Sequence, residues 1–436
     1  MRIAMMTNNY KPFVGGVPIS IERLADSLRD LGHTVYVFAP DYKSPMDDDA
    51  YTFRFPTMKH KIAGAIPVPN LIYSYVKKTI STLHIDLIHV HHPWMIGNVA
   101  TRIGKEFHIP VVFTYHTRYE QYLHYLKPFG YLQNQAGQGN RMAASILDFA
   151  QRQVIQRYLN NFLEKCDMVF APTKSIQDYL KPFHIDTPIN IAPTGLPHVC
   201  FEKHIEATDI REKYLQGKQY LFCTVSRLAK EKNLPFLLRG VAAVKEQLGD
   251  IFNLLILGDG PEKENLMALS RTLNIDRNVF FVGEVPNQKI SSYHQACDLF
   301  LFSSKSETQG IVLLEAMAAY LPVFAIRATG VSDVVNGKNG VLSSDSLAEW
   351  VENLISILQN PAVLIKMKSS ARNTALLYDE KIIANQILER YTYLKMSYEA
   401  EHCLMLHLNG TSQTERGWNI EDKSRMDLLS DCCPAN

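Results

Sequence analysis

The sequence predicts an α/β protein with two doubly wound, Rossmann-like domains that face each other across a cleft. Three observations support this prediction. Short strands alternate with amphipathic helices, the alternation starts again after about residue 200, and the strands are apolar along their whole length. Strands of this kind lie in parallel sheets with helices on both faces. A chain of 436 residues is long enough for two or three domains.

The N-terminal half opens with a strand at residues 2–7, a helix at 18–31 and a strand at 34–39. Apolar side chains recur every three or four positions in the helix, and Gly32 follows where a helix end favours a positive φ angle. Similar apolar stretches predict further strands at residues 86–91, 111–115 and 168–172.

The C-terminal half repeats the alternation. Its strands are predicted at residues 220–227, 252–257, 279–282, 298–302 and 322–326, and its helices at 234–246, 262–273, 288–296 and 310–319. The connection between the halves is expected near residues 194–202, which contain Gly195 and Pro197. Ligands of such sheets bind beyond the carboxyl ends of the strands, so the cleft is the expected site of chemistry.

These boundaries give domains at residues 1–197 and 198–379. A long amphipathic helix follows, and residues 380–400 are expected to pack back toward the N-terminal domain. Residues 401–436 show no sustained periodicity and are expected to form a polar, poorly ordered tail.

The composition argues against several classes of protein. Lys and Arg number 45 and Asp and Glu 44, a balance that disfavours a general nucleic-acid binder. No apolar run is long enough to span a membrane, and the N-terminus lacks the pattern of a secretory signal. The seven scattered cysteines show no metal-binding spacing and favour a reducing, cytoplasmic compartment.

The strongest chemical signal lies at residues 307–318. A strand is followed by a polar loop that carries Glu307, and Gly310 opens a helix. Glycine permits close approach of a ligand, and the free N–H groups of the first helical turn suit a phosphate. Glu315, further along the helix, can accept hydrogen bonds from two sugar hydroxyls. An exposed glutamate on an ordinary amphipathic helix would give the same pattern.

A second cluster, residues 226–233 (SRLAKEKN), follows the first strand of the C-terminal half. Arg227 stands at the strand end, and Lys232 precedes a helix that Asn233 is expected to cap. Two cations beside a helix N-terminus suit a diphosphate. Lys230 is assigned to a solvated face.

Together these motifs resemble family 4 of the retaining GT-B glycosyltransferases. The resemblance rests on SRLxxEKN, E-x7-E, AxxLPVxA and GxxDVVxxGxNG, and with the Gly15-Gly16 loop it covers about residues 1–395. Residues 116–122 (HTRYEQY) and 307–310 (ETQG) look most like the bacterial 1,2-diacylglycerol glucosyltransferases. Tyr320 stands where many relatives have Gly, and Asp333 where Glu is commoner.

The resemblance implies roles for the donor-binding residues. Arg227 and Lys232 would hold the nucleotide diphosphate and stabilise it as it leaves, and Glu315 would bind the ribose. Glu307 would contact the donor sugar, and His116 would reach it from the opposite domain. Backbone contacts to the donor sugar are implied for Gln309, Gly310 and Ile311. Gly15 and Gly16 would admit the diphosphate and the acceptor.

The resemblance also assigns acceptor binding to residues 1–197 and nucleotide-sugar binding to residues 198–379. The UDP-sugar is a substrate, and no metal or other cofactor is expected. Gly258-Asp259-Gly260 lacks the rest of a dinucleotide fingerprint, which disfavours a nicotinamide cofactor. These residues are instead expected to lie beneath the nucleotide base, together with Val285.

Two other patterns favour structural readings. Asp47-Asp48-Asp49 contains DxD but lies in a loop, where a solvated acidic turn is expected. His89, His91 and His92 could ligate a metal, but neighbouring strand residues point to opposite faces and no carboxylate or cysteine completes the set. They are assigned to the cleft edge or to structure.

Residues 54–78 contain five cations and no acid, interleaved with aromatic and aliphatic side chains. Such a composition suits the surface of an anionic membrane, and Lys59, Lys61, Lys77 and Lys78 are the predicted contacts. Residues 119–135, with Tyr119 and Tyr122, form a second candidate. Packing into the N-terminal core is the alternative for both segments.

The resulting prediction is a hexosyltransferase that moves glucose from a UDP-sugar to a membrane lipid, with 1,2-diacylglycerol favoured, at the inner face of the cell membrane. A soluble or polyprenyl-linked glycan acceptor, a UDP-sugar epimerase and a non-catalytic binding module are the alternatives. An epimerase would need no acceptor, and the intact Arg227, Lys232, Glu307 and Glu315 disfavour a binding module. The oligomeric state is not indicated.

Overall fold

The computed structural model describes residues 1–414 apart from short gaps. The gaps are residues 14, 44–47, 63–65, 70–71, 120–130, 133–134, 137–138, 150–153, 184 and 306. Residues 59–62, 66–69 and 401–414 are described by their backbone alone. The chain divides into two compact units, residues 1–389 and residues 390–436. Both of the parallel sheets predicted from the sequence belong to the first unit.

A seven-stranded parallel sheet of order β3-β2-β1-β6-β7-β8-β9 organises the N-terminal half. Its strands are β1 (Arg2–Met6), β2 (Thr34–Pro40), β3 (Thr52–Phe55), β6 (Leu87–Val90), β7 (Val111–Thr114), β8 (Met168–Ala171) and β9 (Ile189–Ile191). A separate antiparallel hairpin comprises β4 (Thr57–Ile62) and β5 (Ile66–Pro69).

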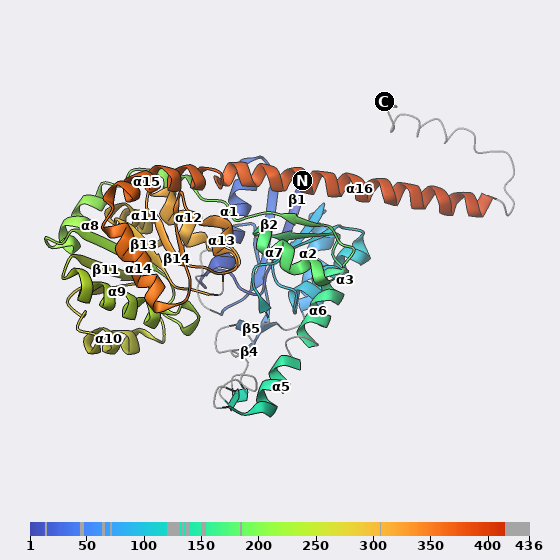
Figure 1. Cartoon of the computed structure of the whole chain (residues 1–436). Helices are drawn as coiled ribbons and strands as arrows, with labels where there is room; N and C mark the ends of the chain where they lie inside the picture. Colours follow the sequence, from blue (N-terminus) through green and yellow to red (C-terminus); the bar gives the residue numbers. More distant parts are fainter. Residues whose placement is uncertain are drawn as a thin grey trace. The chain divides into compact units, whose positions relative to one another are not determined.

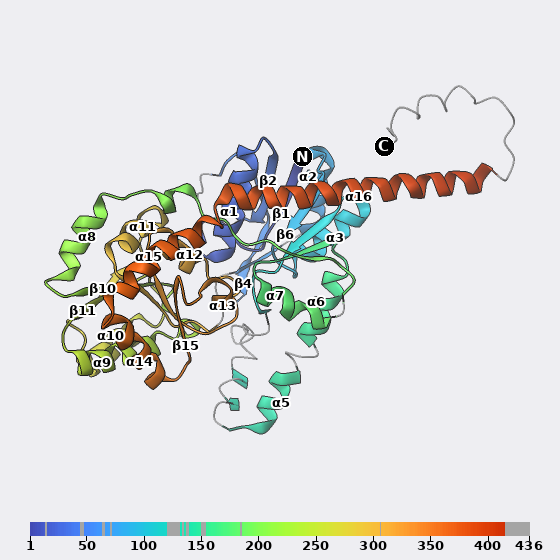
Figure 2. The ribbon, with the colours of Figure 1, turned by 45° about the horizontal axis from the view of Figure 1, so that its top comes forward.

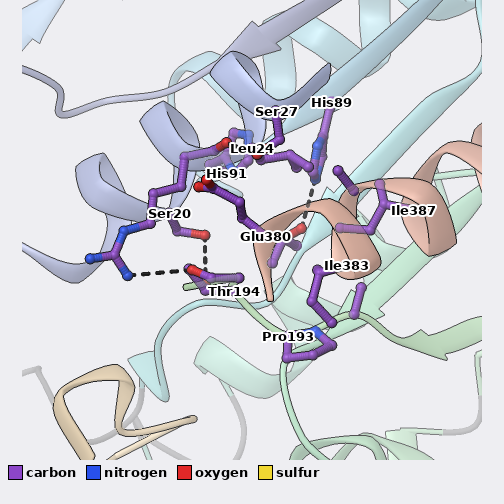
Figure 3. A pocket seen from close by; sticks show the side chains of 15 residues that line it. Ser20, Leu24, Ser27, His89, His91, Pro193, Thr194, Glu380, Ile383 and Ile387 are labelled. Carbon is purple, nitrogen blue, oxygen red and sulfur yellow. Dashed lines mark hydrogen bonds between the residues drawn. The ribbon is translucent and has the colours of Figure 1, made fainter. Parts of the chain in front are cut away.

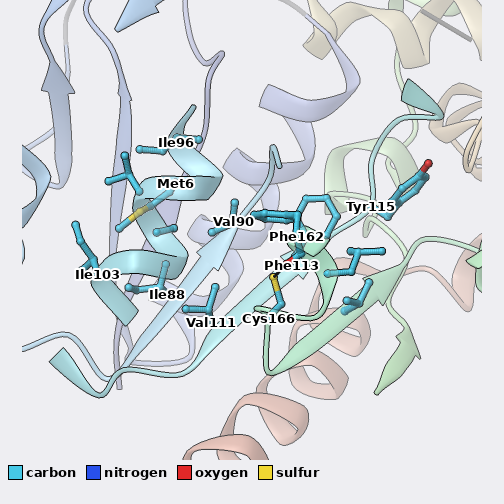
Figure 4. Packing of buried hydrophobic residues seen from close by; sticks show 14 of the residues in the cluster. Met6, Ile88, Val90, Ile96, Ile103, Val111, Phe113, Tyr115, Phe162 and Cys166 are labelled. Carbon is cyan, nitrogen blue, oxygen red and sulfur yellow. Dashed lines mark hydrogen bonds between the residues drawn. The ribbon is translucent and has the colours of Figure 1, made fainter. Parts of the chain in front are cut away.

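Helices cover both faces of this sheet (Figure 1). One face is covered by α1 (Gly16–Asp30), and the other by α2 (Ile72–Leu83), α3 (Ile96–Phe107), α6 (Gln156–Leu163) and α7 (Lys174–Leu180). In the core between sheet and helices, Val90 and Phe113 of the sheet pack with Ile96 of α3 and Phe162 of α6 (Figure 4). The short helix α5 (Arg141–Phe149) lies beyond α6.

A six-stranded parallel sheet of order β12-β11-β10-β13-β14-β15 organises the C-terminal half. Its strands are β10 (Tyr220–Val225), β11 (Phe252–Leu257), β12 (Val279–Gly283), β13 (Leu299–Phe302), β14 (Val323–Ile326) and β15 (Gly340–Ser343). Its helices are α8 (Glu206–Leu215), α9 (Leu234–Leu248), α10 (Lys263–Thr272), α11 (Asn287–Ala296), α12 (Ile311–Ala318), α13 (Val331–Val334), α14 (Leu347–Leu358) and α15 (Pro361–Leu376).

Alternate side chains of these strands enter two separate cores. Phe222 and Leu254 belong to the core that contains side chains of α9, α10 and α14, whereas Cys223 and Leu255 belong to the core of α11, α12 and α15. Burial on both faces explains why the strands are apolar throughout. The predicted fold class of two doubly wound α/β domains is confirmed.

Two local expectations, the cap at Asn233 and the strand end at residue 227, need correction, and the departure at Tyr320 leaves the local backbone unchanged. Asn233 occupies the N-cap position of α9 but makes no side-chain capping bond, because its backbone is in the left-handed region at φ 53°. Tyr320 keeps the left-handed conformation that glycine favours, at φ 57°, and its ring lies 5.0 Å from the guanidinium carbon of Arg372. The strand predicted at 220–227 ends at Val225, which releases Arg227 from the sheet.

The last helix, α16 (Glu380–Thr414), is longer than predicted. Residues 401–414 were expected in a poorly ordered tail, but Glu, Leu and Met in that stretch favour helix over coil and the helix continues. Residues 415–436 lie outside the described part of the chain. None of the described helices is both long and apolar enough to cross a membrane.

Candidate active site

Lys232 and Glu307 meet at the carboxyl edge of the C-terminal sheet. Lys232 follows β10 and Glu307 follows β13, and these strands are neighbours. The lysine Nζ lies 2.7 Å from the glutamate Oε1, and both side chains are mostly buried. Ser303 Oγ donates to the carbonyl of Lys232 at 2.8 Å and ties the two loops together. The structure thus brings together two residues to which the sequence assigned donor chemistry.

Arg227 stands exposed just beyond β10 and forms no ion pair with any residue that the structure describes. The loop that carries it rests on Gly258-Asp259-Gly260, since the Leu228 N–H donates to the Asp259 carbonyl at 2.9 Å. Gly258 has φ 122°, and a Cβ there would lie 2.0 Å from the Ser226 carbonyl oxygen. The glycines, predicted to lie near the nucleotide base, thus allow the backbone at 258–260 to pack closely against the backbone at 226–228, which carries Arg227.

We expect Gly258→Ala to destabilise the protein by about 2–5 kcal/mol, because it adds left-handed strain to a clash with backbone. Denaturant unfolding measures this loss. Gly217→Ala is the matched control, since Gly217 also has a positive φ, 76°, but no atom lies within 4 Å of the place that an added methyl group would take. That control should cost only about 1–2 kcal/mol. Equal losses for the two variants would contradict the role given to the close approach.

Glu315 lies in α12, whose N-cap Gly310 has φ 73°. Its carboxylate Oε1 accepts from Arg23 of α1 at 2.5 Å, and both side chains are mostly buried. The Arg23 guanidinium also contacts the Gly195 carbonyl at 3.4 Å. The acid that sequence reasoning assigned to a ribose therefore connects the two halves of the first unit. Arg23 itself was missed.

The loop before α12 is bonded to the N-terminal half. Thr308 Oγ1 donates to the His116 carbonyl at 2.8 Å, and Thr173 Oγ1 donates to the Thr308 carbonyl at 2.9 Å. The side-chain amide of Gln309 accepts from the Thr194 N–H at 2.8 Å and donates to its carbonyl at 3.1 Å. The role implied for Gln309 was a backbone contact, and these side-chain bonds were not predicted.

The other residues assigned to the donor lie near the same junction or in the C-terminal half. Gly15 and Gly16 form the N-terminus of α1, with Gly15 in an extended conformation at φ 175°. Ile311 begins α12 and is half-buried. Val285, after β12, packs against the core beneath α11 and α12 and is also half-buried.

His116, to which the resemblance assigned contact with the donor sugar, lies where the N-terminal half meets the loop before α12. Its ring Nε2 is hydrogen-bonded to Nδ1 of His91 at 2.8 Å, so its carbonyl, and not this nitrogen, contacts the donor-side loop. His89 pairs with Thr114 Oγ1 at 2.6 Å, and Nδ1 of His92 accepts from the Asn8 N–H at 3.2 Å. The histidines at 89, 91 and 92 therefore have hydrogen-bonding roles within the N-terminal half.

Burial lowers the pKa of His89 to about 3 and that of His92 to about 4, and it lowers the pKa of His91 as well. These groups are neutral in the folded protein, whereas in the unfolded chain they take up protons below about pH 6.5. Their stabilising contribution is therefore complete above pH 6.5 and declines as the pH falls toward about 4.

We expect the free energy of unfolding to fall by up to about 1.4 kcal/mol per pH unit for each of these histidines between pH 6.5 and 4.5. Denaturant titrations across that range measure the slope. His92→Asn removes one titrating group and keeps an acceptor, so it should make the slope shallower. His198→Gln, at an exposed position, should leave the slope unchanged. A pH-independent stability would contradict the neutral assignment.

A small cavity adjoins Arg23 (Figure 3). It is lined by α1, by the ends of β6 and β7, by residues 192–195 and by the first turns of α16. Ser20 Oγ and Thr194 Oγ1 are hydrogen-bonded beside it at 2.8 Å. Ile383 and Ile387 line it opposite α1, so the start of α16 packs against the N-terminal half.

The cationic segment at 54–78 is only partly available for a surface role. Arg54 is paired with Asp48 at 2.6 Å, and Lys77 is paired with Glu106, whereas Lys78 is exposed. The side chains of Lys59 and Lys61 lie outside the described residues, as does Asp47 of the acidic turn.

Tyr119 needs a correction, because it does not face outward. Its ring packs edge-on against Trp94 and Tyr115, and its hydroxyl is buried. Burial also raises its pKa. Tyr119 therefore belongs to the N-terminal core and not to a membrane surface, whereas Tyr122 lies outside the described residues.

Comparison with known proteins agrees with this arrangement. Residues 14–198 match the family described as Glycosyltransferase Family 4, and residues 206–374 match Glycosyl transferases group 1. The chain is 28% identical over 394 residues to the alpha-monoglucosyldiacylglycerol synthase of Acholeplasma laidlawii, covering 88% of this chain and 95% of that protein. It is 29% identical over 332 residues to the enzyme of the same name from Streptococcus pneumoniae, covering 74% and 71%.

Among solved structures, the fold is similar to that of Anabaena Alr3699/HepE in complex with UDP and glucose. The TM-score is 0.69 at 18% identity, over 90% of this chain and all of that one. The two family matches leave uncovered only the ends of the chain and a short connection between the sheets. The chain therefore belongs to the glycosyltransferases of the GT-B fold, with a Family 4 domain followed by a group 1 domain, and is a hexosyltransferase.

Proposed function

We propose that this glycosyltransferase moves glucose from UDP-glucose to 1,2-diacylglycerol and retains the configuration at the sugar. Two relatives that align over most of their own length carry the name alpha-monoglucosyldiacylglycerol synthase, which supports both the sugar and the acceptor. The Anabaena protein of similar fold holds UDP and glucose, which supports the nucleotide. Within this chain, the observation that supports the proposal most is the Lys232–Glu307 pair beside Arg227 at the carboxyl edge of the C-terminal sheet.

The chemistry follows from these residues. The bond between the sugar C1 and the diphosphate oxygen breaks, which places negative charge on UDP and positive charge on the sugar. Arg227, Lys232 and the N–H groups that begin α12 stabilise the leaving diphosphate. The acceptor oxygen bonds to C1 from the face that UDP leaves, and its proton passes to a diphosphate oxygen. Every atom of the acceptor hydroxyl is thereby accounted for.

The test is incubation of the purified protein with a panel of labelled nucleotide sugars and either vesicle-borne diacylglycerol or soluble glycans, followed by lipid extraction. We expect label from UDP-glucose in the lipid phase as an α-glucoside. Label in the glycan fraction would show that the acceptor is a glycan and not diacylglycerol. A changed sugar without any acceptor would identify an epimerase instead.

We expect turnover to persist in excess EDTA, because two cationic side chains and a helix N-terminus provide the charge that stabilises the diphosphate. The measurement is the initial rate with EDTA and after addition of Mg²⁺ or Mn²⁺. Loss of the rate in EDTA and its recovery with either metal would show that the proposed diphosphate site is incomplete.

A further inference from the structure

Helix α5 exposes a row of large apolar side chains. Met142, Ile146 and Phe149 are spaced i, i+4 and i+7, so they lie on one side of the helix. They are 75%, 45% and 62% exposed. Large apolar side chains gathered on one face of a surface helix mark an interaction site on a soluble protein.

The surroundings of α5 leave that row uncovered by the described residues. Both views place α5 beyond α6, away from the seven-stranded sheet (Figures 1 and 2). Ala143, on another side of the helix, is buried. Tyr131 and Val154, on either side of the helix in sequence, are 66% and 57% exposed and extend the apolar character.

The charge around α5 favours an anionic partner. Among the described residues from 131 to 160, the charged side chains are two cations, Arg141 and Arg157, and one acid, Asp148. Arg141 begins the helix and Arg157 lies in α6, and both are exposed. An apolar helix face with exposed cations close to it in the chain suits the interface of an anionic bilayer.

We propose that α5 is the surface by which the protein docks on an anionic membrane. This rests on the proposed function, since a lipid acceptor must be taken from a bilayer. Residues 54–78, which the sequence favoured for this role, have Arg54 and Lys77 engaged in ion pairs. Docking through α5 presents the N-terminal half, to which the sequence assigned the acceptor, to the bilayer.

The test uses the full chain and vesicles rich in phosphatidylglycerol. Met142→Asp/Phe149→Asp places two acids in the exposed row, and Ile365→Asp/Leu377→Asp is the matched control because both of its sites are 67% exposed in the C-terminal half. The wild type and the control should co-sediment with vesicles, and less so at high salt. The α5 variant should lose at least 10-fold in vesicle affinity with an unchanged melting temperature.

The kinetic arm separates docking from chemistry. Turnover of vesicle-borne diacylglycerol should fall at least 10-fold in the α5 variant, while a short-chain, detergent-dispersed acceptor should react at the wild-type rate. Sedimentation of the α5 variant like the wild type, or of neither protein, would overturn the proposal. So would a wild-type dimer that the variant breaks without any vesicle binding. Vesicle binding that depends on α5 but comes with no transfer from UDP-glucose would overturn the proposed function and leave the docking surface standing.

Discussion

Lys232→Ala is expected to lower kcat by about 100-fold or more and to change the donor KM only a few-fold. Its ammonium lies 2.7 Å from Glu307 at the edge of the sheet to which the donor diphosphate is assigned. Charge that grows on the leaving group is stabilised more in the transition state than in the ground state, and loss of one such donor costs about 3 kcal/mol. Arg227→Ala should act in the same direction. Steady-state kinetics with saturating acceptor measure both effects.

Two variants decide how the Lys232 result is interpreted. Lys230→Ala removes an exposed cation two positions away and should leave kcat within two-fold. The double variant Lys232→Ala/Glu307→Gln removes the negative charge that the single variant leaves mostly buried. Recovery of the rate in the double variant would mean that an unpaired Glu307 causes the loss. Persistent inactivity with an intact fold is the result expected for a cation that acts on the diphosphate.

The sequence could place Lys232 and Glu307 at one edge because both follow apolar strands of the same parallel sheet. The carboxyl ends of parallel strands share one edge of the sheet, however the helices pack on its faces. The positions of Lys232 and Glu307 just after their strands therefore predicted where the pair lies. The end of the first strand was predicted two residues too late, because polar residues such as Ser226 and Arg227 can either end a strand or begin the loop after it.

Contacts between the two halves could not be predicted in this way. Arg23 and Glu315 are 292 positions apart, and Thr308 and His116 are 192 apart. Each side chain has several partners of suitable chemistry in the sequence, and only the packed arrangement of the halves selects one. The Gln309 amide illustrates this, since its position in a donor motif gave no sign of its bonds to Thr194.

The surface proposed to bind the membrane could not be predicted from the sequence either. Counting charge in residues 54–78 could not reveal that Lys77 is paired with Glu106, because the partner comes from a different helix. The apolar row of α5 has the 3.6-residue period of any helix that packs on a core, so periodicity alone could not distinguish a covered face from an exposed one. The exposed fractions of Met142 and Phe149 make that distinction.

Glu315→Ala is expected to raise the donor KM by about 10–100-fold and to leave kcat within a few-fold. A carboxylate that accepts from sugar hydroxyls makes charge-assisted bonds worth about 1.5–3 kcal/mol, and the ribose is bound equally in the ground state and the transition state. Inhibition by UDP should weaken by the same factor, since UDP carries the same ribose. A change in KM with kcat retained is the reverse of the result expected for Lys232→Ala.

Arg23 supplies the decisive control, because Glu315→Ala also breaks the ion pair between the two halves. If the ribose contact causes the loss, Arg23→Gln alone leaves UDP inhibition within a few-fold, and Arg23→Gln/Glu315→Ala matches Glu315→Ala. If the ion pair causes it, Arg23→Gln alone reproduces the full rise in KM, and the second substitution adds nothing. The latter result would assign Glu315 to holding the halves together and would remove it from the nucleotide site.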